Sequence, residues 1–197
     1  MPSYFPQSFP AKAPLLRVLL LTLLLFVSGP PSHSFAQEGQ ATRKDKVKVA
    51  FIYNFAKFTT WPDRSFETLP PGSFPICLVG SEPLGSLLDK LTGKKIINDR
   101  TILIRKNPSQ DVLKSCRILY ISASESAQLD SLLKTLNGHP VLTIGNTEGY
   151  AKRGVGINLI EKNEKLGFEI NRKAILKSGL TLSSELLALG VLVDTED

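Results

Sequence analysis

From residue 75 onward, apolar residues gather in short continuous runs instead of being spread evenly. Two of these runs, "PICLVG" (75–80) and "CRILYIS" (116–122), have the pattern of strands that are buried on both faces of a sheet. The stretches "RTILIRK" (100–106) and "PVLTIG" (140–145) are further strand candidates. We therefore predict four strands that form the centre of the fold.

The segments between these runs have the spacing of helices. In the longest of them, leucines three and four positions apart form one apolar face. The predicted helical stretches are 82–91, 108–114 and 124–138. Strands that alternate with helices of this length are typical of βαβ units, which form parallel sheets.

The pattern changes in the last third of the chain. "GINLIEKNEKLGFEIN" (156–171) indicates two strands around a turn at 162–164, which is an antiparallel hairpin. Two helices should follow, one capped by Asn171 and one, formed by "SSELLALGVLV", capped by Ser183. We predict a three-layer α/β sandwich with a mixed, mostly parallel sheet and a C-terminal antiparallel hairpin.

The stretch "KVAFIYNFAKFTTWP" (48–62) indicates an amphipathic helix that ends at Pro62. Its apolar stripe is formed by Val47, Ala50, Phe51, Phe55 and Phe58. We expect the three phenylalanines to pack on the sheet. For Asn54 we expect a structural hydrogen bond, with a ligand contact as the alternative. Trp61 either anchors the end of the helix or offers an exposed aromatic contact.

The N-terminal residues have the pattern of an export signal. Lys12 and Arg17 precede the apolar run "VLLLTLLLFV" (18–27), which is too short to span a membrane, and small residues follow it. An uncleaved anchor is the alternative. The predicted organisation is a signal peptide over 1–36, a flexible segment over 37–43 and an α/β domain over 44–197. The mature protein would then be periplasmic.

Charge adds little to this interpretation. The net charge of +6 falls to +4 when Lys12 and Arg17 are removed, and the remaining excess is dispersed. We therefore expect no nucleic-acid partner. A mildly basic face that contacts an anionic membrane or an acidic partner stays open as an alternative to an ordinary solvated surface.

Few side chains in the predicted mature chain favour catalysis. His139 is its single histidine, so a zinc site of the usual kind and a serine triad are both disfavoured. The turn "VGSEPLG" (79–85) joins a strand to a helix but lacks the complete glycine pattern of a phosphate-binding loop. We predict a protein that is not an enzyme and has no metal or cofactor.

Cys77 and Cys116 each lie at the amino end of a predicted strand. If these strands are parallel neighbours, about 4.8 Å apart, the two cysteines fall within disulfide range. Export would permit the bond. Two buried free thiols are the alternative.

Several of these segments together resemble the YfiR-like family. They occur in the family's order and spacing over about residues 44–193, and are "KVAFIYNFAKFTTWP", "FPICLVG", "RILYIS", "PVLTIG", "GVGINLI", "GFEIN" and "SGLTLSSELLALG". The resemblance implies a periplasmic, commonly dimeric α/β protein without known catalysis. Its best-understood members bind the periplasmic sensor domain of an inner-membrane diguanylate cyclase, repress it, and are drawn off by an outer-membrane lipoprotein. Redox regulation by a second disulfide of some relatives is not expected, because "RGVGIN" (153–158) contains no cysteine.

A regulator of this kind needs a surface for its partner. Glu169 alternates with apolar neighbours in the predicted hairpin, and a helix bearing Ile175 follows. We expect Glu169, Ile175 and Ile157 to contribute to a partner-binding surface, with ordinary core and surface positions as the alternative. A periplasmic small-molecule-binding protein that serves transport or envelope sensing is the second functional hypothesis.

Overall fold

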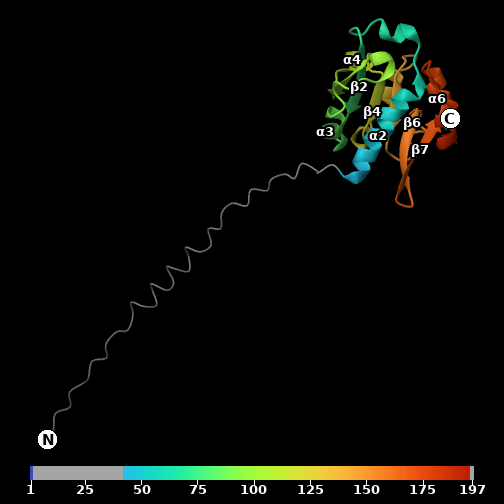
Figure 1. Ribbon diagram of the computed structural model, residues 1–197. Helices are drawn as coiled ribbons and strands as arrows, with labels where there is room; N and C mark the ends of the chain where they lie inside the picture. Colours follow the sequence, from blue (N-terminus) through green and yellow to red (C-terminus); the bar gives the residue numbers. More distant parts are fainter. Residues whose placement is uncertain (2–41, 196–197) are drawn as a thin grey trace. The chain divides into compact units, whose positions relative to one another are not determined.

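The computed structural model describes Met1 and residues 42–195, and its centre is a seven-stranded sheet (Figure 1). The strand order is β3–β2–β4–β5–β6–β7–β9. The strands are β2 (Ser73–Val79), β3 (Thr101–Lys106), β4 (Ile118–Ile121), β5 (Leu142–Gly145), β6 (Ile157–Lys162), β7 (Lys165–Asn171) and β9 (Val191–Val193). The four strands predicted from the apolar runs are β2 to β5, and these four and β6 pair in parallel.

The last strands reverse direction, as expected for a hairpin. β7 pairs antiparallel with β6, and Lys162 lies opposite Lys165. Asn163 and Glu164 form the tight turn between them with positive φ angles of 50° and 61°. The edge strand β9 was not predicted, because "VLV" was assigned to the closing helix. That helix, α7 (Ser184–Leu189), ends before Gly190, where the backbone becomes extended and pairs with β7.

Helices cover both faces of the sheet. Side chains alternate along β2, so that Ile76 and Leu78 pack with α2 and α3, whereas Cys77 and Val79 pack with α4 and α5. The helices are α2 (Arg43–Lys57), α3 (Leu84–Asp89), α4 (Gln110–Leu113), α5 (Leu129–Thr135), α6 (Arg172–Lys177) and α7. The predicted three-layer α/β sandwich with a mostly parallel sheet is confirmed.

Short elements complete the described part of the chain. They are the 3₁₀ helices Asp63–Phe66, Ile97–Asp99 and Ala123–Glu125, and a small antiparallel pair formed by β1 (Thr59–Thr60) and β8 (Thr181–Leu182). The helix predicted over 124–138 is therefore shorter than expected, since a 3₁₀ turn precedes α5.

Helix α2 begins earlier than predicted. Thr42 accepts a hydrogen bond from the Asp45 backbone N–H, and the Asp45 carboxylate accepts one from the Thr42 backbone, which is a capping box. Thr42 and Arg43 therefore belong to the folded domain and not to the expected flexible segment 37–43. The predicted signal peptide (1–36) and residues 37–41 lie outside the described residues.

The expected apolar stripe of α2 is only partly buried. Phe55 is in the core, where it stacks on Phe51 and meets the edge of Phe168 with ring centroids 4.9 Å apart. Phe58 is exposed, because α2 ends at Lys57 and Phe58 is its C-cap. Asn54 is also exposed, and its side chain forms no hydrogen bond within residues 42–195. The structural bond expected for Asn54 is therefore absent.

Trp61 and Asn171 hold chain segments in place. Trp61 is buried with its ring edge against Phe74, so it anchors the chain after α2. Asn171 is fully buried and caps α6 by accepting a hydrogen bond from the Ala174 N–H (2.8 Å). Its amide also donates to the Ala151 carbonyl and to Thr195 Oγ1. Both side chains thus have structural roles.

The predicted disulfide between Cys77 and Cys116 is confirmed. Both residues are fully buried, and their Cα atoms are 5.9 Å apart. Cys77 lies in β2, and Cys116 lies two residues before the first residue of the adjacent strand β4. The bond therefore joins two parallel neighbours, as the sequence argument required.

Candidate partner-binding edge

The carboxyl ends of β2 and β4 are where parallel α/β sheets usually bind ligands, because the strand order reverses there. In this protein the polar groups of the turn bind one another. The Gly80 N–H donates to Asn107 Oδ1 (2.8 Å), the Ser81 N–H to Ser124 Oγ (3.0 Å), and the Ser122 hydroxyl to the Ser81 carbonyl (3.0 Å). These two N–H groups and this carbonyl of the turn are thus already bound within the protein.

Neither a metal-binding cluster of side chains nor a helix that could cross a membrane is found among the described residues. Among residues 42–195, no three His, Cys, Asp or Glu side chains are placed to hold a metal ion. His139 lies in the loop before β5, remote in sequence from the predicted turn at 79–85. None of the helices in the described part of the chain is long and apolar enough to cross a membrane.

One buried cation, Arg117, was not predicted from the sequence. Arg117 follows Cys116, and its guanidinium donates to the carbonyls of Pro140, Lys114 and Ser115 at 3.1 to 3.5 Å. Burial lowers the pKa of Arg117 to about 10, and the group is still charged at neutral pH. Because these acceptors are backbone carbonyls of the loops around it, Arg117 has a structural role.

The three residues expected at a partner surface are placed differently from one another. Ile157 and Ile175 are buried in the core, so their predicted placement on a surface is corrected. Ile157 pairs with Ile170 within the sheet, and the Ile175 side chain packs against Gly156. Glu169 points to the opposite face, is partly exposed, and accepts a hydrogen bond from Asn158 Nδ2 (3.1 Å).

Apolar side chains are nevertheless exposed on the edge strand β9 and just before it. Leu192 lies opposite Ile170 and points to the face of the strand that Glu169 does not share. Three residues keep more than half of their solvent-accessible surface: Leu189 (75%), Val191 (56%) and Leu192 (57%). We call these three residues the C-terminal edge. Val191 lies opposite Glu169 in the β7–β9 register. On the neighbouring helix α6, Leu176 is 55% exposed and borders a small groove with Leu187 of α7. Exposed apolar groups of this size next to a carboxylate are typical of an interface core and its rim.

Among residues 42–195, the backbone of β9 also has a neighbour on one side only. β9 is the last strand in the sheet order and pairs with β7 only. An outer strand of this kind presents unpaired N–H and C=O groups that can bind another chain. The C-terminal edge therefore combines apolar side chains with free backbone groups, which favours binding over catalysis.

Comparison with known proteins agrees with a domain of this class. The sequence matches the YfiR/HmsC-like family over residues 45–191, and the chain belongs to that family. Family membership supports a regulatory role, and this domain is not known as an enzyme.

The comparisons with solved structures and with curated proteins give less information than the family match. A crystal structure of a conserved domain protein from Vibrio cholerae matches with a TM-score of 0.49 and 15% sequence identity. The match covers 75% of this chain and 59% of that protein. No curated protein matches the sequence.

Proposed function

We propose that this protein is a periplasmic regulatory binding protein that represses a membrane-bound sensor by contact with its periplasmic domain. The sensor we expect is an inner-membrane diguanylate cyclase, so the protein would lower cyclic-di-GMP synthesis. Membership of the YfiR/HmsC-like family supports the regulatory role and the periplasmic location. The proposal includes no catalytic step.

The C-terminal edge is the observation that carries the proposal. Burying three large apolar side chains contributes about 1.5 to 3 kcal/mol each when the contact is complete. A partner strand added beside β9 would also satisfy its outward N–H and C=O groups. Glu169, opposite Val191, would lie at the rim, where a charge affects the rate and specificity of association more than its strength.

A matched pair of lysine substitutions tests this surface. Val191→Lys puts a charge on the C-terminal edge, whereas Val47→Lys makes the same change at an exposed valine on α2. We expect Val191→Lys to weaken binding to the purified periplasmic domain of the cyclase roughly thirtyfold and to release cyclic-di-GMP synthesis in cells. Val47→Lys should leave both unchanged. Equal loss in the two variants, or none in Val191→Lys, would refute the proposal.

Two further partners follow from the same proposal. A homodimer could occupy the C-terminal edge through two β9 strands, and an outer-membrane lipoprotein could remove the regulator from the cyclase. Light scattering of the purified protein measures its molar mass and so shows whether it is a dimer. If Val191→Lys converts a dimer to a monomer and leaves cyclase binding intact, the C-terminal edge is the dimer interface and not the repressing surface.

The second functional hypothesis, a small-molecule-binding protein, has one observation in its favour. This observation is a cationic cavity on the face of the sheet opposite α2, and its chemistry can be considered independently of the C-terminal edge.

A further inference from the structure

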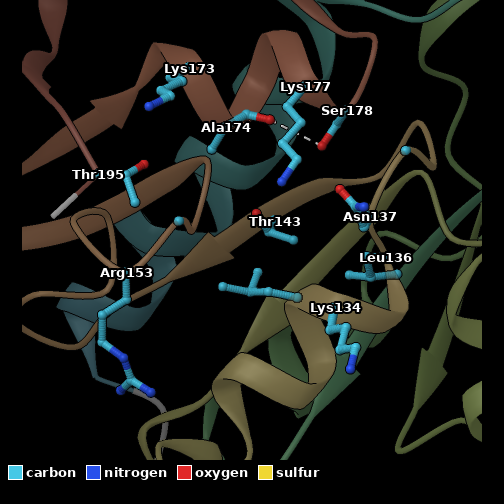
Figure 2. Close-up of a pocket in the computed structure, with 13 residues that line it drawn as sticks. Lys134, Leu136, Asn137, Thr143, Arg153, Lys173, Ala174, Lys177, Ser178 and Thr195 are labelled. Atoms are coloured by element: carbon cyan, nitrogen blue, oxygen red, sulfur yellow. Dashed lines mark hydrogen bonds between the residues drawn. The ribbon is translucent and has the colours of Figure 1, made fainter. Parts of the chain in front are cut away.

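A cavity of about 450 Å³ lies where α5 ends, near the amino-terminal ends of β5 and β6 (Figure 2). Its walls come from the end of α5, the start of β5, the segment before β6, helix α6 and Thr195. This volume is in the range of cavities that hold small molecules. The cavity is remote in sequence from the turn at 79–85 and includes none of the residues of the C-terminal edge.

The charged residues that line the cavity are all basic. They are Lys134, Arg153, Lys173 and Lys177. Arg153 is paired with Asp130 (3.0 Å), but within residues 42–195 no carboxylate pairs with the three lysines. Figure 2 shows the Lys177 side chain extending from α6 toward Thr143, whereas the charged ends of Lys134, Lys173 and Arg153 point away from Thr143. The lining residues that the structure describes thus carry an excess of positive charge.

Two hydroxyl groups in the lining have hydrogens to donate. Thr143 Oγ1 accepts a hydrogen bond from the Gly156 N–H (2.8 Å), and Thr195 Oγ1 accepts one from Asn171 Nδ2 (2.8 Å). Neither hydroxyl donates to an acceptor within the described residues, so each O–H can serve a ligand. Thr143 is only 7% exposed, which places this donor at the bottom of the cavity.

We propose that this cavity binds a small phosphorylated molecule through its phosphate group. The ammonium and hydroxyl groups named above are all donors, and a phosphate offers acceptor oxygens and negative charge. Lysine binds phosphate as a point charge, and hydrogen bonds to charged groups are stronger than those between neutral groups. The depth of Thr143 favours a small ligand over an acidic protein surface, whose side chains would contact the exposed lysines first.

Calorimetric titration with pyrophosphate and with ribose 5-phosphate tests the site, at constant ionic strength and with protein purified from cells that express the whole chain. We expect saturable binding of one ligand per chain. Lys177→Gln should weaken it about tenfold. Lys94→Gln makes the same change at an exposed lysine outside the cavity, and it should alter the binding affinity by no more than about twofold. No saturable binding of either probe, or equal losses in the two variants, would overturn the proposal.

Thr143 provides a second test. Thr143→Val removes the hydroxyl at nearly constant volume and should weaken ribose 5-phosphate binding about fivefold, whereas Thr143→Ser should retain it. Thermal melting identifies a folding defect in the valine variant, because the Gly156 N–H loses its acceptor there. If Thr143→Val melts at a lower temperature than the unmodified protein, its binding result is set aside. The comparison of Lys177→Gln with Lys94→Gln then decides whether the cavity is the binding site. Loss of binding in the serine variant, with its fold intact, would contradict the role of the hydroxyl.

Free phosphate esters and phosphorylated lipid headgroups share this chemistry. Vesicles of phosphatidylcholine with and without phosphatidic acid separate the two sources. Binding of pyrophosphate and of phosphatidic acid that Lys177→Gln weakens, without ribose 5-phosphate binding, would assign the cavity to a headgroup. Each of these outcomes leaves the test of the C-terminal edge unaffected, since that test uses different residues and a protein partner.

Discussion

The two edges of the central sheet differ in how they meet solvent. Outside β3, the segment Gly93–Lys95 lies alongside the strand: the Gly93 N–H donates to the Ile102 carbonyl (3.0 Å), and the Ile102 N–H donates to the Lys94 carbonyl (2.9 Å). Charged side chains follow, and Lys106 pairs with Asp89. At the other edge, no segment of the described chain covers β9, which exposes Val191 and Leu192. Proteins usually protect edge strands, so an uncovered apolar edge indicates a surface kept for a partner.

The interior beside the two edges differs as well. The disulfide and the carbonyl-bound Arg117 lie at β2 and β4, the second and third strands counted from the β3 edge. β9 is only three residues long and is held mainly by its pairing with β7. We therefore expect most of the domain's stability to depend on the β3 side and partner binding to depend on the β9 side.

Removing the disulfide should have the largest effect on stability. The double variant Cys77→Ala/Cys116→Ala opens a loop between residues 39 apart in sequence and should lower the free energy of unfolding by about 3 to 4 kcal/mol, measured by urea denaturation. Because the bond is remote from β9 in the sheet order, the folded fraction should still bind the cyclase domain. Unchanged stability, or loss of binding by the folded protein, would contradict the claim that stability depends on the β3 side and partner binding on the β9 side.

Gly190 tests how β9 is held. A Cβ at this position would lie 2.5 Å from Ile170 Cδ1 and 2.7 Å from Phe168 Cε2, so Gly190→Ala must push β9 away from the core. We expect a loss of about 2 kcal/mol and faster amide exchange in β9. Gly167→Ala is the control, because its nearest contact would be an ordinary 3.8 Å. Full stability and unchanged exchange in Gly190→Ala would show that β9 is not packed as described.

The first turn of α2 connects the two sides, since Lys44 pairs with Glu161 of β6 and Lys48 with Glu82 after β2. Asp45 caps this turn. Burial alone would raise the pKa of Asp45, but hydrogen bonds from Thr42 and the charge of Lys48 hold it below its ordinary value of 3.8. The charged carboxylate therefore stabilises the fold above that value, and this contribution is lost as the pH falls through the lower pKa of the folded state.

Asp45→Asn should accordingly cost about 1 kcal/mol at neutral pH. The difference between Asp45→Asn and the unmodified protein should shrink as the pH is lowered below 3.8. Thermal melting at a series of pH values measures it. A difference that grows toward acid pH would have the wrong sign and would exclude this account of the cap.

Much of the fold could be predicted because the signals are local. Apolar runs located β2 to β5, the stretch 156–171 predicted the hairpin, and the position of the two cysteines on neighbouring strands predicted their bond. The edge strand β9 was missed, since three residues after a leucine-rich helix carry little strand signal and depend on pairing with β7, which ends twenty residues earlier.

The candidate sites were harder to predict because they depend on tertiary placement. Ile157 and Ile175 belong to alternating patterns that fit either face, and only the folded sheet shows that both are buried. The cationic cavity unites Lys134, Arg153 and Lys177, which are far apart in sequence and look like ordinary surface charges. Burial of Thr143 within an apolar strand was the one local hint of a buried donor.

Hydrogen exchange of the two edge strands tests the central claim most directly. Amides 191–193 of β9 and 101–106 of β3 would be followed by mass spectrometry with and without the periplasmic domain of the cyclase. We predict that bound partner slows exchange in β9 and leaves β3 unchanged. Binding that leaves β9 exchange unaltered, or that protects β3 instead, would contradict the assignment of the C-terminal edge as the partner surface.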